Sequence, residues 1–246
     1  MIASLPMYDM PALHGANDRL WQATRAILGF GPDALTRAPD LWAQWESPDL
    51  VLSQTCGYPY RAKLHDKVQL VATPNFALKG CPYGTYNSVF LARRTDKITR
   101  LSELAGKRFA FNEALSQSGW AAPKVHLDKR GVALGPLLQT GAHQLSAEAV
   151  AEGRADFAAL DAHTWHMLKR NTALGKKLTV VARTAPTPAL PYITSQAQDP
   201  TVIRAALAEA LSTLSTQDRD ALGIKSLVSI SSQTYRAVES PKAPQV

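Results

Sequence analysis

Short apolar segments alternate with amphipathic ones along most of the chain, and this alternation limits the possible folds more than any other feature. Segments rich in β-branched residues predict strands, as in LVLSQ (50–54), VQLVAT (68–73) and SVFLAR (88–93). Apolar residues spaced three and four apart predict helices, as in 16–29. Short strands that alternate with helices are typical of an α/β fold built on mostly parallel sheets.

The same patterns predict the remaining elements. The further strands are 2–5, one beginning at 108, 136–141, 156–160 and 178–183. The further helices are 101–106 with Ser102 as its cap, 119–130, 147–153 capped by Ser146, 163–171, 200–214 started by Asp199 and Pro200, and a last one capped by Thr216.

Composition excludes several classes of protein. The chain has 246 residues, of which 46% are hydrophobic and 19% charged, as is ordinary for a globular protein large enough for two small lobes. No apolar run approaches the roughly 18 residues of a membrane span. The net charge of +7 favours an anionic partner. The basic residues are scattered and not interleaved with aromatic residues, so we expect no nucleic-acid binding.

One turn is rich in hydroxyl groups. NEALSQSGW (112–120) lies between a predicted strand and a predicted helix, where the first helical N–H groups have no partner within the helix. These donors, the helix dipole and the hydroxyls of Ser116 and Ser118 would suit a small oxyanion such as a phosphonate or phosphate. The alternative is that the serines only cap the helix.

Other polar and aromatic side chains follow predicted strands. His143, in TGAHQLS, could donate to an anion or simply pack. Asp161 ends the DFAAL strand, where it could accept a proton from a ligand hydroxyl or cap the next helix. Tyr8, Tyr58 and Tyr86 could each belong to the core or clamp a ligand.

The chain has two cysteines, Cys56 and Cys81, and neither has a second cysteine or a histidine at metal-ligand spacing. The cysteines therefore give no sign of a metal site, and an anion held by neutral N–H and O–H donors needs no metal or cofactor. Cys56 could be a nucleophile or a structural thiol, and a Cys56–Cys81 disulfide stays open if the two segments are neighbours. The opening MIASLPMYD has no signal-peptide pattern, so both a removed leader and a cytoplasmic protein are compatible with it.

The order of these segments resembles that of the substrate-binding components of phosphate/phosphite/phosphonate ABC transporters, the phosphonate-binding-protein family. The resemblance is carried by SLPMYD (4–9), SQTCGYPY (53–60), GTYNSVFLAR (84–93), LAGKRFAFNEALSQSGW (104–120), TGAHQLSAEAVAEGRADFAALDAHTW (140–165) and TPALPYITS (187–195). It implies a type II periplasmic-binding-protein fold, with two α/β lobes and a ligand cleft between them. The first lobe would comprise 1–91 and 188–246 and the second 92–187, with the proline-rich 184–191 as the return crossing.

The resemblance also implies the ligand contacts. The family's anion-binding turn matches Ser116, Gln117, Ser118 and Gly119, its histidine matches His143, its acidic residue matches Asp161, and its cleft residues match Tyr8, Tyr58 and Tyr86. Ser-Gln-Ser here replaces the Ser-Thr-Ser run that is frequent in the family, so one hydroxyl is missing. Trp120 stands where the family has a smaller residue. The implied protein is a periplasmic monomer without catalytic residues that delivers its ligand to an ABC permease.

Two other classes of function remain compatible with the sequence. The same fold could bind a sulfonate, a nitrate or a thiamine-precursor pyrimidine, for transport or as a sensor. A hydrolase could instead use Cys56 or His143 on the same type of scaffold.

Overall fold

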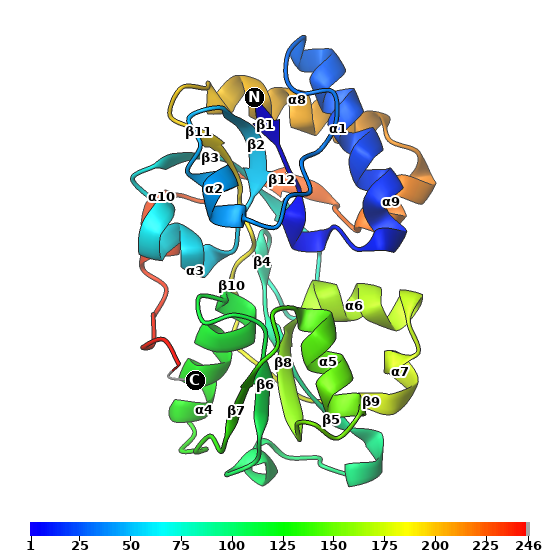
Figure 1. Cartoon of the computed structure of the whole chain (residues 1–246), viewed down its shortest axis with the longest axis vertical. Coiled ribbons are helices and arrows are strands. Elements are labelled where there is room, and N and C mark those ends of the chain that lie inside the picture. Colours follow the sequence, from blue (N-terminus) through cyan, green and yellow to red (C-terminus); the bar gives the residue numbers. More distant parts are fainter. Residues whose placement is uncertain (245–246) are drawn as a thin grey trace. The chain divides into compact units, whose positions relative to one another are not determined.

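The computed structural model of the chain describes residues 1–244, which form two compact units. Unit 1 comprises Met1–Ala77 and Pro188–Ala237, and unit 2 comprises Leu78–Thr187 and the segment from Val238 on. The chain therefore passes from one unit to the other three times. Figure 1 shows a sheet and helices in each unit, coloured by position in the chain.

The sheet of unit 1 has five strands in the order β1-β2-β11-β3-β12. These strands are β1 (Ile2–Ala3), β2 (Leu50–Gln54), β3 (Val68–Asn75), β11 (Tyr192–Ser195) and β12 (Ser226–Val228). β1 is parallel to β2, whereas β11 is antiparallel to both β2 and β3, and β12 is antiparallel to β3. The helical segments of the unit are η1 (Pro6–Tyr8), η2 (Pro11–Leu13), α1 (His14–Leu28), α2 (Leu41–Trp45), α3 (Gly57–Pro59), η3 (Tyr60–Leu64), α8 (Pro200–Thr213), α9 (Thr216–Leu222) and α10 (Ser232–Arg236).

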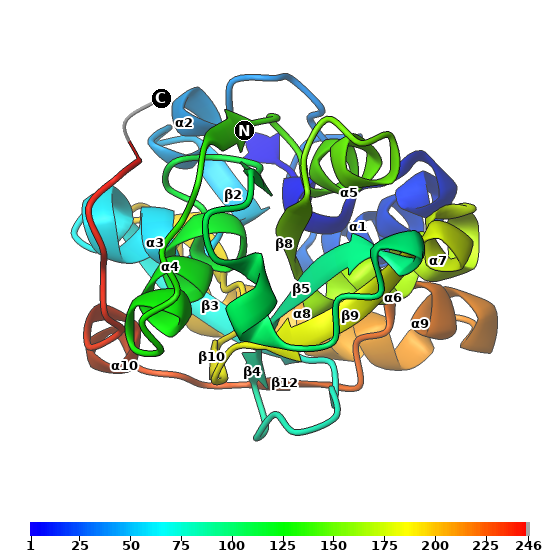
Figure 2. The ribbon, with the colours of Figure 1, turned by 90° about the horizontal axis from the view of Figure 1, so that it is seen from below.

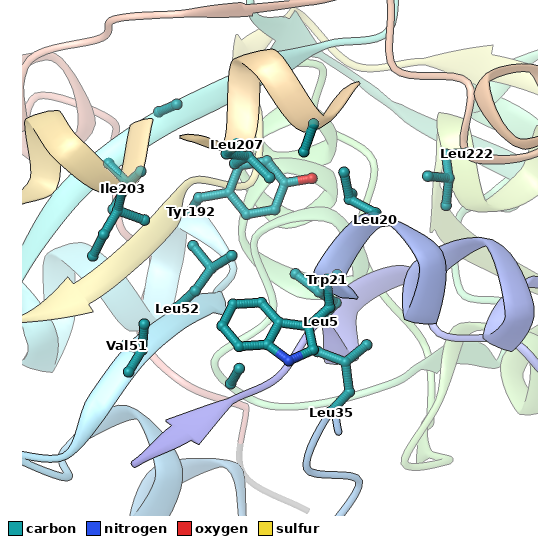
Figure 3. Close-up of a cluster of buried hydrophobic side chains, with 14 of the residues drawn as sticks. Leu5, Leu20, Trp21, Leu35, Val51, Leu52, Tyr192, Ile203, Leu207 and Leu222 are labelled. Carbon is teal, nitrogen blue, oxygen red and sulfur yellow. The ribbon is translucent and has the colours of Figure 1, made fainter. Parts of the chain in front are cut away.

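Apolar side chains cover both faces of this sheet. On one face, Trp21 of α1 and Leu207 of α8 form a cluster with Tyr192 of β11 (Figure 3). The next residue along β11, Ile193, belongs to a second cluster that contains Tyr235 of α10. Side chains alternate between the two faces of a strand, so β11 contributes to both clusters.

The larger sheet of unit 2 has five strands in the order β7-β6-β8-β5-β9. These strands are β5 (Ser88–Arg93), β6 (Phe109–Phe111), β7 (Leu137–Gln139), β8 (Phe157–Asp161) and β9 (Leu178–Arg183). β6 is parallel to β7 and β8, whereas β5 is antiparallel to β8 and to β9, which lies beside it in Figure 2. The helical segments are η4 (Arg94–Asp96), η5 (Leu101–Leu104), η6 (Gln117–Ala121), α4 (Ala122–Asp128), α5 (His143–Ala151), α6 (Ala162–Asn171) and α7 (Leu174–Lys177). A separate two-stranded sheet pairs β4 (Thr85–Tyr86) with β10 (Thr187–Pro188).

The prediction of mostly parallel sheets is wrong, because both five-stranded sheets are mixed. β5 is the first strand of its sheet, and β11 is the first strand formed after the chain re-enters unit 1. Both run antiparallel to their neighbours. Periodicity marks a segment as a strand but says nothing about its direction, which depends on the end of the unit at which the chain enters.

The division into units differs from the expected lobes in two places. The expected boundary between 91 and 92 lies inside β5, where Leu91 pairs with Ala158 and Ala92 with Phe157 of β8. Strand pairing therefore holds all of β5 in unit 2. The segment from Val238 on also groups with unit 2 rather than with the first lobe. The last two positions of the expected lobe, 245 and 246, lie outside the described residues.

Three predicted helix caps are wrong. Ser102 and Ser146 lie inside η5 and α5, and Thr216 is the first residue of α9, which Ser215 caps. The prediction for α8 is confirmed, because the side chain of Asp199 accepts a backbone hydrogen bond at its start.

Candidate functional site

Three parallel strands of unit 2 end at the same edge of the sheet. β7, β6 and β8 lie side by side and run in the same direction, so the segments that follow them are neighbours. These segments contain the predicted turn after β6, His143 after β7, and Asp161 at the end of β8. Ligands of α/β proteins bind preferentially at such an edge.

The turn after β6 leads into a helix that begins earlier than expected. A helical turn of π type, Gln117–Ala121, continues directly as α4, so the helix starts at 117 rather than at 119. Ser116 is its N-cap, and the Ser116 Oγ accepts the backbone N–H of Gly119 at 2.9 Å. The capping interpretation therefore holds for the Ser116 hydroxyl. Gln117 and Ser118 are both buried, at 2% exposed.

Gly119 is required by close packing inside this turn. A Cβ atom at this position would lie 1.8 Å from the Oδ1 atom of Asn112, well inside van der Waals contact. Oδ1 of Asn112 is itself buried and accepts no hydrogen bond within residues 1–244. Asn112 was not among the predicted site residues, although it stands directly after the strand in NEALSQSGW.

Ser118 forms a hydrogen bond with the predicted histidine. The Ser118 Oγ lies 2.9 Å from the Nε2 atom of His143. Burial lowers the pKa of His143 from its ordinary 6.5 to about 4, so the imidazole is neutral at pH 7. Its Nδ1 atom is buried and has no hydrogen-bond partner in the described part of the chain.

His143 is the first residue of α5, and this helix has no side-chain cap. Its N-cap position is Ala142, which offers no hydrogen-bonding side chain. Ser146, the predicted cap, instead bonds the Ala142 carbonyl at 3.2 Å and the Thr140 hydroxyl at 2.7 Å. The first N–H groups of α5 therefore receive no side-chain acceptor from the N-cap, which suits an external anion.

Asp161 fills the corresponding position of the next helix. Its side chain is 1% exposed, and Oδ1 accepts the N–H groups of His163 at 2.6 Å and Thr164 at 3.1 Å. The capping interpretation of Asp161 is thus confirmed. The Asp161 carboxylate therefore caps the start of α6, whereas no side chain caps the start of α5 at the same sheet edge.

The three predicted tyrosines are buried in separate elements. Tyr86 lies in β4 of unit 2 and is 1% exposed. In unit 1, the ring of Tyr8 meets the ring of Phe76 edge to face at 5.3 Å. The guanidinium carbon of Arg61 lies 4.4 Å from the ring centre of Tyr58. The structure therefore brings the four turn residues and His143 together with Asp161 at one sheet edge, and places Tyr8 and Tyr58 in the other unit.

The disulfide hypothesis is wrong, because neither Cys56 nor Cys81 forms a disulfide. Cys56 precedes α3 in unit 1, whereas Cys81 lies in unit 2, between β3 and β4. The two segments are thus not neighbouring strand ends of one sheet. Burial raises the pKa of the Cys81 thiol, which keeps it protonated at neutral pH.

The described residues contain neither a metal-binding cluster nor a membrane-spanning helix. Residues 1–244 contain no group of three or more histidine, cysteine or acidic side chains placed to hold a metal ion. No helix within them has the length and hydropathy needed to span a bilayer.

Comparison with protein families identifies the chain. Residues 47–239 match the model of a family described as the periplasmic substrate-binding protein of the phosphonate ABC transporter. The chain belongs to this family. The resemblance stated from the sequence is confirmed. Among curated proteins, none matches the sequence.

Solved structures confirm the type II periplasmic-binding-protein fold. PhnD1 from Prochlorococcus marinus, solved with methylphosphonate, is 16% identical with a TM-score of 0.77, covering 96% of this chain and 94% of that one. A binding protein component of an ABC phosphonate transporter from Pseudomonas aeruginosa is 15% identical with a TM-score of 0.71, covering 95% and 83%. XAC2383 from Xanthomonas citri, solved with chloride ion, is 19% identical with a TM-score of 0.68, covering 96% and 93%. At these identities the shared property is the fold.

Proposed function

We propose that this chain captures a small phosphorus oxyanion, namely a phosphonate, phosphite or phosphate, on the turn Ser116–Gly119 and delivers it to an ABC permease. The observation that carries the proposal is the hydrogen bond between the buried Ser118 and the half-buried, neutral His143, at the start of α5, which has no side-chain cap. Family membership supports the solute-binding role. The methylphosphonate held by PhnD1 supports the choice of phosphorus oxyanions.

The protonation state of His143 determines what Ser118 can offer to a ligand. A neutral imidazole carries one proton, on either Nδ1 or Nε2. With the proton on Nε2, His143 donates to the Ser118 Oγ, and the serine O–H is left to donate to an anion. With the proton on Nδ1, the Ser118 O–H would donate to Nε2 and would not be available to the ligand. Nδ1 lacks a partner within residues 1–244 in either case, so we propose the first tautomer because it leaves the serine proton to the anion.

The same pair could be a catalytic dyad, but its surroundings favour binding. A serine nucleophile needs a general base that is oriented by a third group at the far ring nitrogen. Within residues 1–244, Nδ1 of His143 meets no such group. A pKa of about 4 also makes this imidazole a weak base at neutral pH. We therefore propose that the chain binds its ligand without altering it.

The remaining predicted residues have supporting roles in this proposal. Asp161 accepts a hydrogen from a protonated ligand oxygen or a ligand amine, and Tyr8, Tyr58 and Tyr86 stay predicted ligand contacts. The family description supports a periplasmic location and a permease partner. We expect the protein to act as a monomer.

The test is a calorimetric and thermal-shift screen against phosphate, phosphite, methylphosphonate, aminoethylphosphonate, sulfate, taurine, nitrate and a pyrimidine. A ligand at 100 times its Kd should stabilise the fold by about 2.7 kcal/mol. We expect this effect from a phosphorus oxyanion alone. Stabilisation by the pyrimidine, nitrate or a sulfur oxyanion alone, or by no compound, would contradict the proposal.

Ser118→Ala tests the placement of the ligand. Loss of one hydrogen bond to a charged ligand should cost about 1.5–3 kcal/mol, or roughly a ten- to hundredfold rise in Kd. Ser212→Ala is the matched control, because Ser212 is exposed on α8 of unit 1. If both variants bind the ligand with the same affinity, the turn 116–119 does not hold the anion.

A further inference from the structure

The C-terminal segment makes the third passage of the chain from unit 1 to unit 2. It leaves unit 1 after α10 and is grouped with unit 2 from Val238 on (Figure 1). Tyr235 fixes α10 in unit 1, because its buried hydroxyl donates to the Ala189 carbonyl at 2.7 Å and lies 2.7 Å from the Thr73 hydroxyl. The segment thus starts from a firmly held helix.

Contacts with Trp120 and Lys129 hold the segment in unit 2. The indole Nε1 of Trp120 donates to the backbone carbonyl of Lys242 at 3.0 Å. The ammonium of Lys129 lies 2.7 Å from the carboxylate of Glu239, and both side chains are more than half exposed. Exposed ion pairs contribute little, so the indole hydrogen bond is the stronger of the two anchors.

Trp120 connects this anchor to the anion-binding turn. It is 3% exposed, and its ring packs against Phe111 of β6 with ring centres 5.2 Å apart. Its backbone N–H donates to the carbonyl of Ser116 at 3.2 Å, and it directly follows Gly119. The residue that holds the C-terminal segment is therefore part of the helical turn that carries Ser118.

We propose that residues 238–244 form a strap that holds the turn 116–120 in its binding geometry through the Trp120–Lys242 hydrogen bond. The strap should restrict the motion of the turn 116–120 whether or not a ligand is bound. Any effect of the strap on the affinity for a phosphorus oxyanion rests on the proposed function. Because the segment is covalently continuous with α10, it links the binding turn of unit 2 directly to a fixed helix of unit 1.

Amide hydrogen exchange of the ligand-free protein tests the strap. We would compare the full chain with a chain that stops after Ala237 and with Trp120→Phe, which removes the N–H donor. The control is Lys124→Ala, which breaks the Lys124–Asp128 ion pair of α4 and none of the contacts named for the segment. We expect amides of the turn helix 117–121 to exchange about fivefold faster in the first two variants, as befits the loss of one hydrogen bond of about 1 kcal/mol. The control should match the full chain.

A double-variant cycle separates the strap from simple packing. If the indole acts through the strap, Trp120→Phe should have almost no further effect in the chain that stops after Ala237. Equal exchange of 117–121 with and without the segment would overturn the proposal, as would fully additive effects. Loss of exchange protection without any phosphonate binding would retain the strap and reject only the proposed function.

Discussion

The two sheets present different chemistry in the segments that follow their strands. In unit 2, Ser118 after β6 supplies a buried hydroxyl, His143 after β7 a neutral imidazole, and Asp161 at the end of β8 a carboxylate. In unit 1 the segments after β1 and β2 supply the aromatic rings of Tyr8 and Tyr58. In both units the polypeptide that follows a strand can carry a binding residue. The residue types at these positions determine the kind of ligand that could bind there.

This difference sets an expectation for mutagenesis. Hydrogen-bond donors determine how well an oxyanion is held, because each buried anion oxygen needs a donor to replace water. Aromatic rings contribute contact area and shape. Changes at the edge of unit 2 should therefore have larger effects than the corresponding changes in unit 1.

The largest predicted effect is the pH dependence caused by His143. Its folded-state pKa of about 4 lies below its ordinary 6.5, so the unfolded chain binds more protons between these values. Stability should therefore fall as the pH drops from 6.5 to 4, by up to about 3 kcal/mol from this residue. His143→Gln should remove that part of the loss, as measured by denaturant unfolding at pH 7, 5.5 and 4.5. Parallel curves for the two proteins would show that the imidazole is not buried as described.

Gly119→Ala should destabilise the protein by about 1–3 kcal/mol, as overpacking of a tight site does. Asn112→Ala in the same chain should restore part of the loss, because it removes the oxygen that the new methyl group would strike. Gly57→Ala is the counterpart in unit 1, where a Cβ would meet the Tyr235 ring at an ordinary 3.7 Å. Thermal unfolding of the three variants measures the contrast. Equal losses of stability in Gly119→Ala and Gly57→Ala would contradict the predicted difference between the two sites.

Asp161 should reveal its capping role through the choice of replacement. Asp161→Ala should cost about 1 kcal/mol of stability, whereas Asp161→Asn should cost much less, because asparagine also caps helices well. If Asp161 also accepts a ligand hydrogen, as we propose, Asp161→Asn should still weaken ligand binding in calorimetry. If Asp161→Asn is stable and binds the ligand with unchanged affinity, Asp161 caps the helix but does not contact the ligand.

Tyr58→Phe in unit 1 should have the smallest effect. The ring and its packing remain, so we expect affinity to change by about twofold or less, within a few tenths of a kcal/mol. A loss as large as that of Ser118→Ala would place a decisive hydrogen bond in unit 1 and would reverse the comparison.

The sequence predicts those features that depend on neighbouring residues, such as turns and helix starts. The turn 112–120 was identified because serines follow an apolar strand, and α8 because Asp199 and Pro200 start a helix. The cap of α5 was misassigned to Ser146 because a serine before an apolar run is a common cap. The helix begins four residues before the predicted start at 147, at His143, without any side-chain cap.

Features that depend on distant segments could not be predicted in the same way. The directions of β5 and β11 depend on where the chain enters each unit. The hydrogen bond of Trp120 to Lys242 joins residues 122 positions apart, and no local pattern marks it. The family resemblance assigns Ser118 and His143 to one site but does not predict the hydrogen bond between them, because spacing alone does not bring residues 25 positions apart together.

The most direct test of the central claim is a nuclear magnetic resonance titration of the isotope-labelled protein with methylphosphonate. The account predicts that the largest amide shifts occur at 117–121 and at 143–145, with smaller shifts at 55–60, and that sulfate at the same concentration leaves all three segments unchanged. Shifts centred on 55–60, with the turn of unit 2 unaffected, would contradict the assignment of the anion to that turn.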